Sequence, residues 1–256
     1  MGILNITPDS FSDGGRFVDP SIAIAHARTM AQSGADILDV GAESTRPYGD
    51  AEPVTYETEI SRLAPVLAPV VALGLPVSID TMKAKVADWA VQTGAAIIND
   101  VWGLQRDPEM ARVVAKHETP VVVMHNRDSA DSGIDIVADM MAFFARSLDI
   151  ADAAGIRRDR IVLDPGIGFG KTPTQSIISL AHVDALKRFG LPLLVGASRK
   201  RFISSIVPTN PDQRLGGSIA AHLLAVQAGA DIIRAHDVAE TVQAVRMAEA
   251  IVANRA

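Results

Sequence analysis

The chain has 256 residues, 48% of them hydrophobic, and a formal net charge of -6 at pH 7. This length can bury a large core, and α/β barrels often use about 200–250 residues as one domain, so we expect a single domain over residues 1–256. The acidic balance argues against a nucleic-acid surface, which needs clustered lysines and arginines. The absence of cysteine excludes disulfides and cysteine-ligated metal sites, and it is consistent with the cytoplasm.

The amino terminus lacks the basic region and apolar stretch of a signal peptide. No apolar run elsewhere approaches the roughly 20 residues of a membrane span. We therefore expect a soluble cytoplasmic protein without a membrane partner. Residues 2–6 already have the pattern of a strand, which leads us to expect that an N-terminal segment is missing from the sequence.

Short apolar runs alternate with longer segments of helical periodicity along the whole chain. Strands are predicted at residues 2–6, 36–40, 76–79, 96–99, 120–124, 160–164, 192–196 and 231–235. Helices are predicted at residues 21–33, 56–73, 83–92, 134–154, 176–189, 217–227 and 239–252, with a weaker one at 109–116. Eight alternating units predict an α/β fold in which parallel strands close into a (β/α)₈ TIM barrel.

The strand entries repeat at intervals of two units. SGADILDV, TGAAIIND and AGADIIRA lead into the second, fourth and eighth strands, whereas GLPVSID, ETPVVVMH and GLPLLVG lead into the third, fifth and seventh. Gly34, Gly94 and Gly229 stand where glycine in the left-handed conformation ends a helix. This repetition favours a closed barrel over an open doubly wound sheet.

The segment DPGIGFGKT, residues 164–172, raises the question of a phosphate-binding P-loop. That loop needs a glycine, four residues of any kind, and then Gly-Lys-Ser/Thr. Gly170, Lys171 and Thr172 match its end, but Pro165 stands where the first glycine is required and has no N–H to offer. A nucleotide hydrolase therefore remains an alternative only if the loop tolerates Pro165.

Active sites of such barrels lie at the carboxyl ends of the strands. The residues there that can hydrogen-bond or carry charge are Asn5, Glu43 to Arg46, Asp80, Asn99, Asp100, His125, Asp164, Ser198 to Lys200 and Arg234 to Asp237. Turn formation and capping explain single Asp or Asn residues in such places. They do not explain the cations that follow the second, seventh and eighth strands.

Three of these cations, Arg46, Lys200 and Arg234, would meet at one mouth of the barrel. With His236 they would suit a di- or triphosphate-like group, since Arg offers a planar fork of donors and Lys a point charge. Two carboxylates would lie across the barrel from each other, and an amide would lie between them.

Asp80 and Asp164 are these carboxylates, and Asn99 is the amide. Such a set suits a flat heterocycle with a guanidine-like edge, because a carboxylate can accept two N–H bonds from that edge. The expected ligand is therefore a polar bicyclic ring that carries phosphate.

Seven motifs occur together, from the first residue to about Val238. They are NITPDSFSDGG (5–15), GAESTRP (41–47), SIDT (78–81), IND (98–100), DPGIGFGK (164–171), SRK (198–200) and RAHD (234–237). Each is weak alone, but in this order they closely resemble dihydropteroate synthases, enzymes of folate biosynthesis. The resemblance implies a transferase that joins 7,8-dihydropterin-6-ylmethyl pyrophosphate to p-aminobenzoate, releases pyrophosphate and uses Mg²⁺.

The resemblance also implies roles for individual residues. The pterin pocket would be formed by Asp80, Asn99, Met124, Asp164 and Lys200. Pyrophosphate would lie against Asn5, Arg46, Arg234 and His236, with Mg²⁺ bridging it to Asn5 and Asp13. The aminobenzoate would lie between Thr45 to Pro47, Phe169 and Ser198 to Lys200. The family often forms homodimers, which the apolar helices at 217–227 and 239–252 would support.

The sequence departs from the family pattern at Tyr48, which precedes the glycine that usually follows Pro47, and at Arg201, where some members have a serine. The contacts of those two positions with aminobenzoate are therefore not carried over. A direct role for His125 stays open, because the family gives the contact to its neighbour Met124. The other histidines outside the motifs, His26, His117, His182 and His222, are expected on packed or solvated helix faces.

Two further alternatives remain besides the nucleotide hydrolase. A methyltransferase that moves a methyl group from methyltetrahydrofolate to a corrinoid protein shares the barrel but has no need of the SRK and RAHD motifs. A pterin-binding paralogue without turnover is favoured only by Tyr48 and the short amino terminus.

Overall fold

The computed structural model describes residues 1–7, 19–43 and 54–254. The predicted site residues Asp13, Thr45, Arg46 and Pro47 lie outside these ranges, as does Tyr48. In the described residues, the first six strands form a parallel sheet in chain order, and the last two strands form a second sheet. The strands are β1 Gly2–Asn5, β2 Leu38–Gly41, β3 Val77–Asp80, β4 Ile97–Asp100, β5 Val121–Met124, β6 Ile161–Asp164, β7 Leu194–Val195 and β8 Ile232–Ile233.

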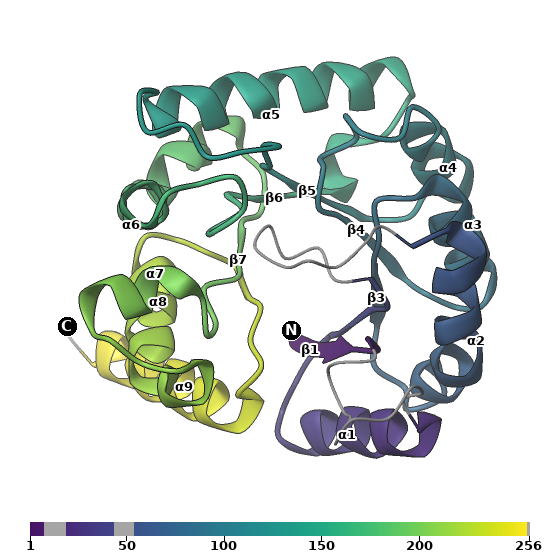
Figure 1. Cartoon of the computed structure of the whole chain (residues 1–256), viewed down its shortest axis with the longest axis horizontal. Helices are drawn as coiled ribbons and strands as arrows, with labels where there is room; N and C mark the ends of the chain where they lie inside the picture. The colour runs from purple at the N-terminus through teal and green to yellow at the C-terminus, as the bar shows by residue number, and fades with distance from the viewer. Residues whose placement is uncertain (8–18, 44–53, 255–256) are drawn as a thin grey trace.

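Backbone contacts join the two sheets at both seams. The N–H of Leu163 donates to the carbonyl of Pro192 at 2.9 Å, and the N–H of Ile3 donates to that of Ala235 at 3.1 Å. Parallel bridges pair Leu163 with Leu193 and Gly2 with Ala235. The ring of strands is therefore complete, with helices around it (Figure 1), and the predicted TIM barrel is confirmed.

The described helices follow the strands as the periodicity predicted. They are α1 Pro20–Gln32, α2 Tyr56–Val71, α3 Ala84–Gln92, α4 Met110–His117, α5 Ile136–Ala153, α6 Pro173–Ala181, α7 Arg201–Ile206, α8 Leu215–Gln227 and α9 Val238–Ala253. None of them is long and apolar enough to cross a membrane. Gly34, Gly94 and Gly229 have φ of 93°, 111° and 97°, as helix-ending glycines should.

Two predictions about helices were wrong. The helix expected over 176–189 is α6 followed by a 3₁₀ segment, Val183–Phe189. His182 is the C-cap of α6: its backbone N–H donates to the carbonyl of Ile178 at 3.1 Å, and its ring Nδ1 lies 2.9 Å from the same oxygen. Helix α7 was not predicted, since six residues are too few to show a helical period.

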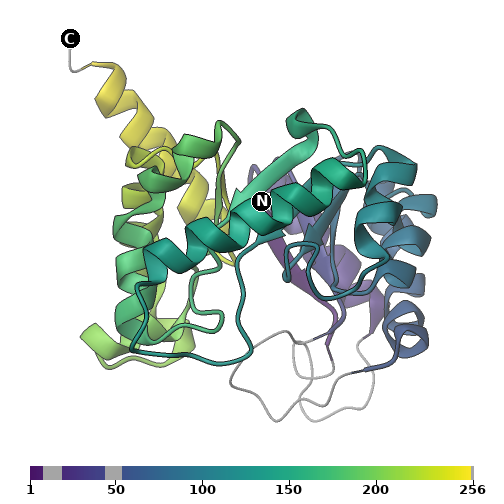
Figure 2. The ribbon, with the colours of Figure 1, turned by 90° about the horizontal axis from the view of Figure 1, so that it is seen from above.

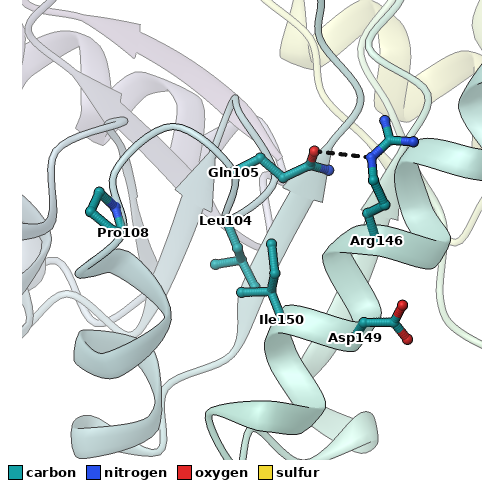
Figure 3. Close-up of a pocket in the computed structure, with 6 residues that line it drawn as sticks. All are labelled: Leu104, Gln105, Pro108, Arg146, Asp149 and Ile150. Atoms are coloured by element: carbon teal, nitrogen blue, oxygen red, sulfur yellow. Dashed lines mark hydrogen bonds between the residues drawn. The ribbon is translucent and has the colours of Figure 1, made fainter.

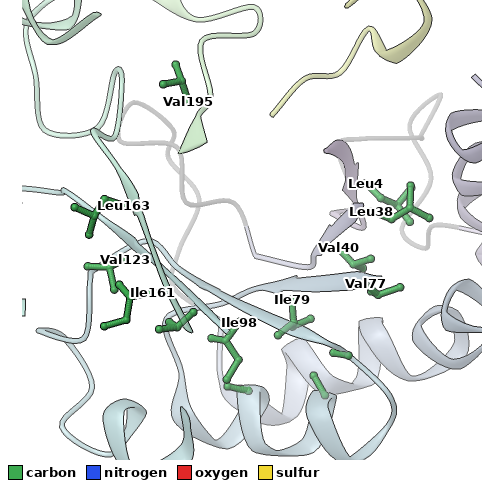
Figure 4. Close-up of a cluster of buried hydrophobic side chains, with 14 of the residues drawn as sticks. Leu4, Leu38, Val40, Val77, Ile79, Ile98, Val123, Ile161, Leu163 and Val195 are labelled. Carbon is green, nitrogen blue, oxygen red and sulfur yellow. The ribbon is translucent and has the colours of Figure 1, made fainter. Parts of the chain in front are cut away.

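Alternation along the strands divides the side chains between two faces. One set packs against the helices as a buried apolar cluster (Figure 4). Its strand members include Leu4, Leu38, Val40, Val77, Ile79, Ile98, Val123, Ile161, Leu163 and Val195. Because successive strand residues point to opposite faces, the residues between them face the barrel interior. Asp39, Ser78 and Asp80 are among those interior residues, so the interior is polar where β2 and β3 end.

Helix α8 buries His222, which is 1% exposed. Neither of its ring nitrogens has a hydrogen-bond partner in the part of the chain that the structure describes. Burial lowers the pKa of His222 to about 4, whereas an unfolded histidine titrates near pH 6.5. Between these values the unfolded chain binds a proton that the folded chain does not, so stability is lost as the pH falls.

We therefore expect His222→Leu to lose less unfolding free energy than the parent protein between pH 6.5 and 4. Urea denaturation at a series of pH values measures the difference. His182→Leu, at an exposed position, is the control for loss of an imidazole. Equal pH slopes for the parent and His222→Leu would contradict the prediction.

Candidate active site

Polar side chains from three of the first four strands stand level at the carboxyl end of the sheet. The strand register pairs Asn5 with Gly41, Gly41 with Asp80, and Asp80 with Asn99. Gly41 leaves space for its neighbour, because a Cβ there would lie 3.2 Å from the Cβ of Asp80. The predicted ends of β1, β3 and β4 thus meet at one height in the barrel.

Arg234 crosses the barrel interior from the end of β8. Its Nε donates to Asp39 Oδ2 at 2.6 Å, and its Nη2 donates to Asp80 Oδ2 at 2.8 Å. The amide Nδ2 of Asn99 donates to the same oxygen of Asp39 at 3.2 Å. One guanidinium therefore holds two carboxylates and, through one of them, an amide.

Asp39 was missed by the sequence analysis, which considered only the residues at strand ends. Asp39 lies inside β2 and is fully buried. A signal was present, because a charged residue inside the apolar run DILDV is rare unless it is paired. The structure makes Asp39 the link between Arg234 and Asn99.

Burial makes this group of acidic side chains unlike exposed carboxylates. It raises the pKa of Asp80 to about 7, against the opposing charge of Arg234. Three buried oxygens, Asp39 Oδ1, Asp80 Oδ1 and Asn99 Oδ1, have no hydrogen-bond partner among the described residues. Buried acceptors of this kind carry an energetic penalty until a donor meets them, so the interior is suited to a ligand rich in N–H groups.

Asp164 ends β6 opposite this group and stands beside Met124 in the strand register. Its Oδ1 accepts the backbone N–H of Gly166 at 2.7 Å. Burial raises the pKa of Asp164, and the hydrogen bond from Gly166 opposes the rise. Met124 is also buried, so it supplies an apolar wall next to this carboxylate.

Lys200 and Phe169 form a cation–π contact. The Nζ of Lys200 lies 3.9 Å from the centroid of the Phe169 ring. Gly168 lies next to this lysine, since a Cβ there would be 3.4 Å from Lys200 Cδ, and its φ of 82° favours glycine. The SRK segment after β7 is thereby joined to the glycine-rich loop after β6.

Ser198 and His236 pair at the ends of β7 and β8. The hydroxyl of Ser198 accepts the backbone N–H of His236 at 3.2 Å and lies 3.0 Å from its ring Nδ1. Burial, followed by the charges of Arg234 and Arg199, lowers the pKa of His236 to about 3. His236 therefore offers a neutral ring, and the positive charge beside it comes from its neighbours.

The remaining strand-end residues make contacts within the protein. Glu43 accepts a bond from Lys83 at 2.5 Å, and Asp237 pairs with Arg199. Asp100 accepts the N–H groups of the turn after β4, from Trp102 and Leu104 at 2.9 and 2.6 Å. His125 is fully buried between Lys171 and Asp139.

Of the sequence-predicted site, the described part of the chain thus brings together Asp80, Asn99 and Arg234 around Asp39. It places Asp164 next to Met124, Phe169 next to Lys200, and Ser198 next to His236.

The comparisons with known proteins agree over nearly the whole chain. The family described as pterin binding enzyme matches residues 1–236. Dihydropteroate synthase of Bacillus subtilis (strain 168) is 44% identical over 252 residues, which cover 98% of this chain and 87% of that one. This chain belongs to the dihydropteroate synthase family.

Two solved members of the dihydropteroate synthase family share its three-dimensional structure. The enzyme from Clostridium difficile, crystallised in the presence of pteroic acid, has a TM-score of 0.93 at 45% identity and covers 98% of this chain and 95% of its own. The enzyme from Xanthomonas albilineans with 4-aminobenzoic acid has the same TM-score and identity and covers 98% and 92%. The family assignment therefore rests on fold and sequence together.

A hollow of about 620 Å³ lies elsewhere, between the turn before α4 and helix α5 (Figure 3). Leu104, Pro108 and Ile150 line it, with Gln105, Arg146 and Asp149. In Figure 3 Arg146 donates to Gln105 across its upper edge. It contains none of the strand-end residues described above.

The buried pair of Asp39 and Arg234 gives a direct test of this arrangement. Replacing one partner of a buried ion pair leaves the other charge without compensation, so Asp39→Asn should lower the unfolding free energy by about 3 kcal/mol. Urea denaturation at neutral pH measures this loss. Asp152→Asn, in an exposed pair with Arg158, is the matched control and should change it by less than about 1 kcal/mol. Equal effects of the two substitutions would mean that Asp39 does not hold the site together.

Proposed function

We propose that this chain condenses 7,8-dihydropterin-6-ylmethyl pyrophosphate with p-aminobenzoate to give 7,8-dihydropteroate and pyrophosphate. The observation that carries the proposal is the set of buried, unpartnered acceptor oxygens on Asp39, Asp80 and Asn99, in a chain of the dihydropteroate synthase family. The reaction is a step of folate biosynthesis. We assign it to one barrel domain working in the cytoplasm.

The pterin ring lies in the barrel mouth, between Asp164 and the Asp80–Asn99 side. Its aminopyrimidinone edge is rich in N–H donors, which the carboxylate of Asp164 and the oxygens of Asp80 and Asn99 accept. Met124 packs against the face of the ring. Lys200 supplies a positive charge to the pterin pocket. Because these acceptors are buried, each hydrogen bond to the ring is stronger than it would be in water.

We assign the pyrophosphate leaving group to Arg46, Arg234 and His236, of which Arg234 and His236 follow β8. The bond between the pterin CH₂ carbon and the pyrophosphate oxygen breaks first, and its electron pair leaves with pyrophosphate. The resulting cation is delocalised into the dihydropterin ring, and the negative charges of Asp80 and Asp164 stabilise it. The lone pair of the uncharged amine of p-aminobenzoate then forms the new C–N bond, and the amine loses a proton.

Asn5 fits a magnesium site next to the leaving group. Its side chain is half-buried at the carboxyl end of β1, and its amide oxygen is a hard donor of the kind that Mg²⁺ prefers. Mg²⁺ commonly takes few protein ligands and completes its shell with water and phosphate oxygens, so Asn5 would be one ligand and Asp13 is the second ligand that we propose. When bound, the ion supplies charge that stabilises the departing pyrophosphate.

We assign p-aminobenzoate to the Lys200 side of the mouth, against Phe169 and Ser198. Thr45 and Pro47, which lie outside the described residues, are further proposed contacts. The contact between Lys200 and the Phe169 ring supports this position, because it places an aromatic wall and a cation together. An aromatic carboxylate needs one of each.

The first experiment is pyrophosphate release by the purified chain with Mg²⁺, with and without p-aminobenzoate, and identification of dihydropteroate by mass. Product that requires both substrates is the expected result. Pterin binding by calorimetry without turnover would instead indicate the non-catalytic paralogue that Tyr48 keeps open.

The role of Asp164 is tested in the same assay. Asp164→Asn should weaken pterin binding about tenfold or more, because an amide cannot accept two N–H bonds from the ring edge as a carboxylate does. Asp152→Asn, at an exposed aspartate on helix α5, is the matched control. Unchanged pterin affinity in Asp164→Asn would remove this residue from the pterin pocket.

We further propose a homodimer through α7, α8 and α9, which gather on one side of the barrel (Figures 1 and 2). Large apolar side chains are exposed on these helices and the residue after α7: Ile206, Val207, Leu224, Met247, Ile251 and Val252. Exposed apolar groups of this kind mark an interface. Light scattering should give twice the mass of the 256-residue chain, and Leu224→Glu should give the mass of one chain. A parent protein with the mass of one chain would refute the dimer.

A further inference from the structure

Lys171 ends the glycine-rich loop that begins after Asp164, and its side chain is fully buried. Its ammonium lies 2.9 Å from the carbonyl oxygen of Gly166 and 3.2 Å from that of Phe169. It also lies 2.6 Å from Nδ1 of His125. A buried ammonium is costly unless it is hydrogen-bonded, and here the loop itself and the end of β5 supply the acceptors.

His125 extends the contact to helix α5. Its Nε2 lies 2.9 Å from Asp139 Oδ2, and the other carboxylate oxygen of Asp139 accepts from Arg127 at 2.8 Å. Burial, with the charge of Lys171, lowers the pKa of His125 to about 3. The ring is therefore neutral, and one tautomer fits both contacts: Nδ1 accepts from Lys171 and Nε2–H donates to Asp139.

The loop held by Lys171 is fitted closely against the end of β5. A Cβ on Gly166 would lie 1.9 Å from the carbonyl oxygen of His125, and one on Gly170 would lie 2.5 Å from the carbonyl oxygen of Arg127. Both glycines have positive φ, 63° and 53°. The loop can therefore take this path only without side chains at these positions.

Two groups of the reaction site depend on that path. The N–H of Gly166 orients the carboxylate of Asp164. The carbonyl oxygen of Gly166 accepts a hydrogen bond from Lys171. Phe169 gives its carbonyl oxygen to the same ammonium and its ring to Lys200. A substitution of Lys171 would thus displace both the carboxylate of Asp164 and the ring of Phe169.

We propose that Lys171, paired with His125, is a positioning residue that fixes the loop between Asp164 and Lys171 for binding of the pterin and aminobenzoate. The inference rests on the proposed function of the barrel mouth. Lys171 is not a catalytic residue, because its ammonium is enclosed and turned to protein acceptors. The lysine that resembled the end of a P-loop therefore binds its own loop.

Lys171→Met tests the proposal, because methionine keeps the length of the side chain and removes the ammonium. We expect a dihydropterin probe to bind about tenfold more weakly by calorimetry, with a matching rise in KM for the pterin substrate and a fall in kcat. Lys187→Met, at an exposed position in the 3₁₀ segment after α6, is the matched control and should keep parent values. A folded Lys171→Met protein with parent pterin affinity and kcat would overturn the proposal.

Variants of His125 separate positioning from packing. His125→Gln keeps an acceptor for Lys171 and should retain most of the pterin affinity, whereas His125→Leu should weaken it as Lys171→Met does. The double variant Lys171→Met/His125→Leu should be no weaker than either single one, since both remove the same contact. Equal loss in His125→Gln and His125→Leu, or additive losses in the double variant, would overturn the pairing.

Should Lys171→Met fail to fold, Asp139→Asn tests the proposal instead. Asp139 is half-buried and lies at the far end of the network formed by Lys171, His125 and Asp139. A several-fold loss of pterin affinity supports the network, and parent affinity overturns it. Pterin binding by the parent protein without turnover would refute the proposed reaction alone, because the comparison of pterin affinities would still test Lys171.

Discussion

The shared guanidinium of Arg234 is the interaction on which the barrel mouth depends. It joins the end of β8 to carboxylates from β2 and β3, which lie 195 and 154 residues away in the chain. Two buried carboxylates without a cation between them would repel each other and be driven to take up protons. With Arg234 between them, β2, β3 and the end of β8 carry one polar cluster.

The same cluster leaves some of its hydrogen-bond acceptors unused. Asp39, Asp80 and Asn99 each keep one buried oxygen without a partner in the described part of the structure. A protein optimised only for stability would not retain such groups, because each adds a desolvation penalty. Their retention is intelligible if a ligand supplies the donors, and the proposed pterin edge does so.

The opposite wall is built on a different principle. Asp164 is oriented by a backbone N–H, and the loop after it is held by a buried lysine instead of by a helix or strand. Positive-φ glycines bring this loop so close to β5 that a side chain on Gly166 or Gly170 would collide with it. A precise loop is thereby obtained from residues that are individually flexible, because buried charge and close contact remove their freedom.

Much of the fold could be predicted from the chain itself. Eight alternating units identify the barrel, and each described strand lies within a few residues of its predicted place, because a buried parallel strand requires an apolar run and a crossover requires a helical period. The short helix α7 and the 3₁₀ segment at Val183–Phe189 were missed, since they are too short or too irregular for a period.

The sequence also located the residues at the strand ends, and Pro165 counted against a P-loop there. The partners of those residues were decided only by the tertiary structure. Asp39 binding Arg234, Lys171 binding His125, and a neutral His236 all depend on distances between segments that are remote in the chain. Composition and spacing determine which elements form and where they end, whereas pairing and protonation depend on burial, which exists only once the ring of strands has closed.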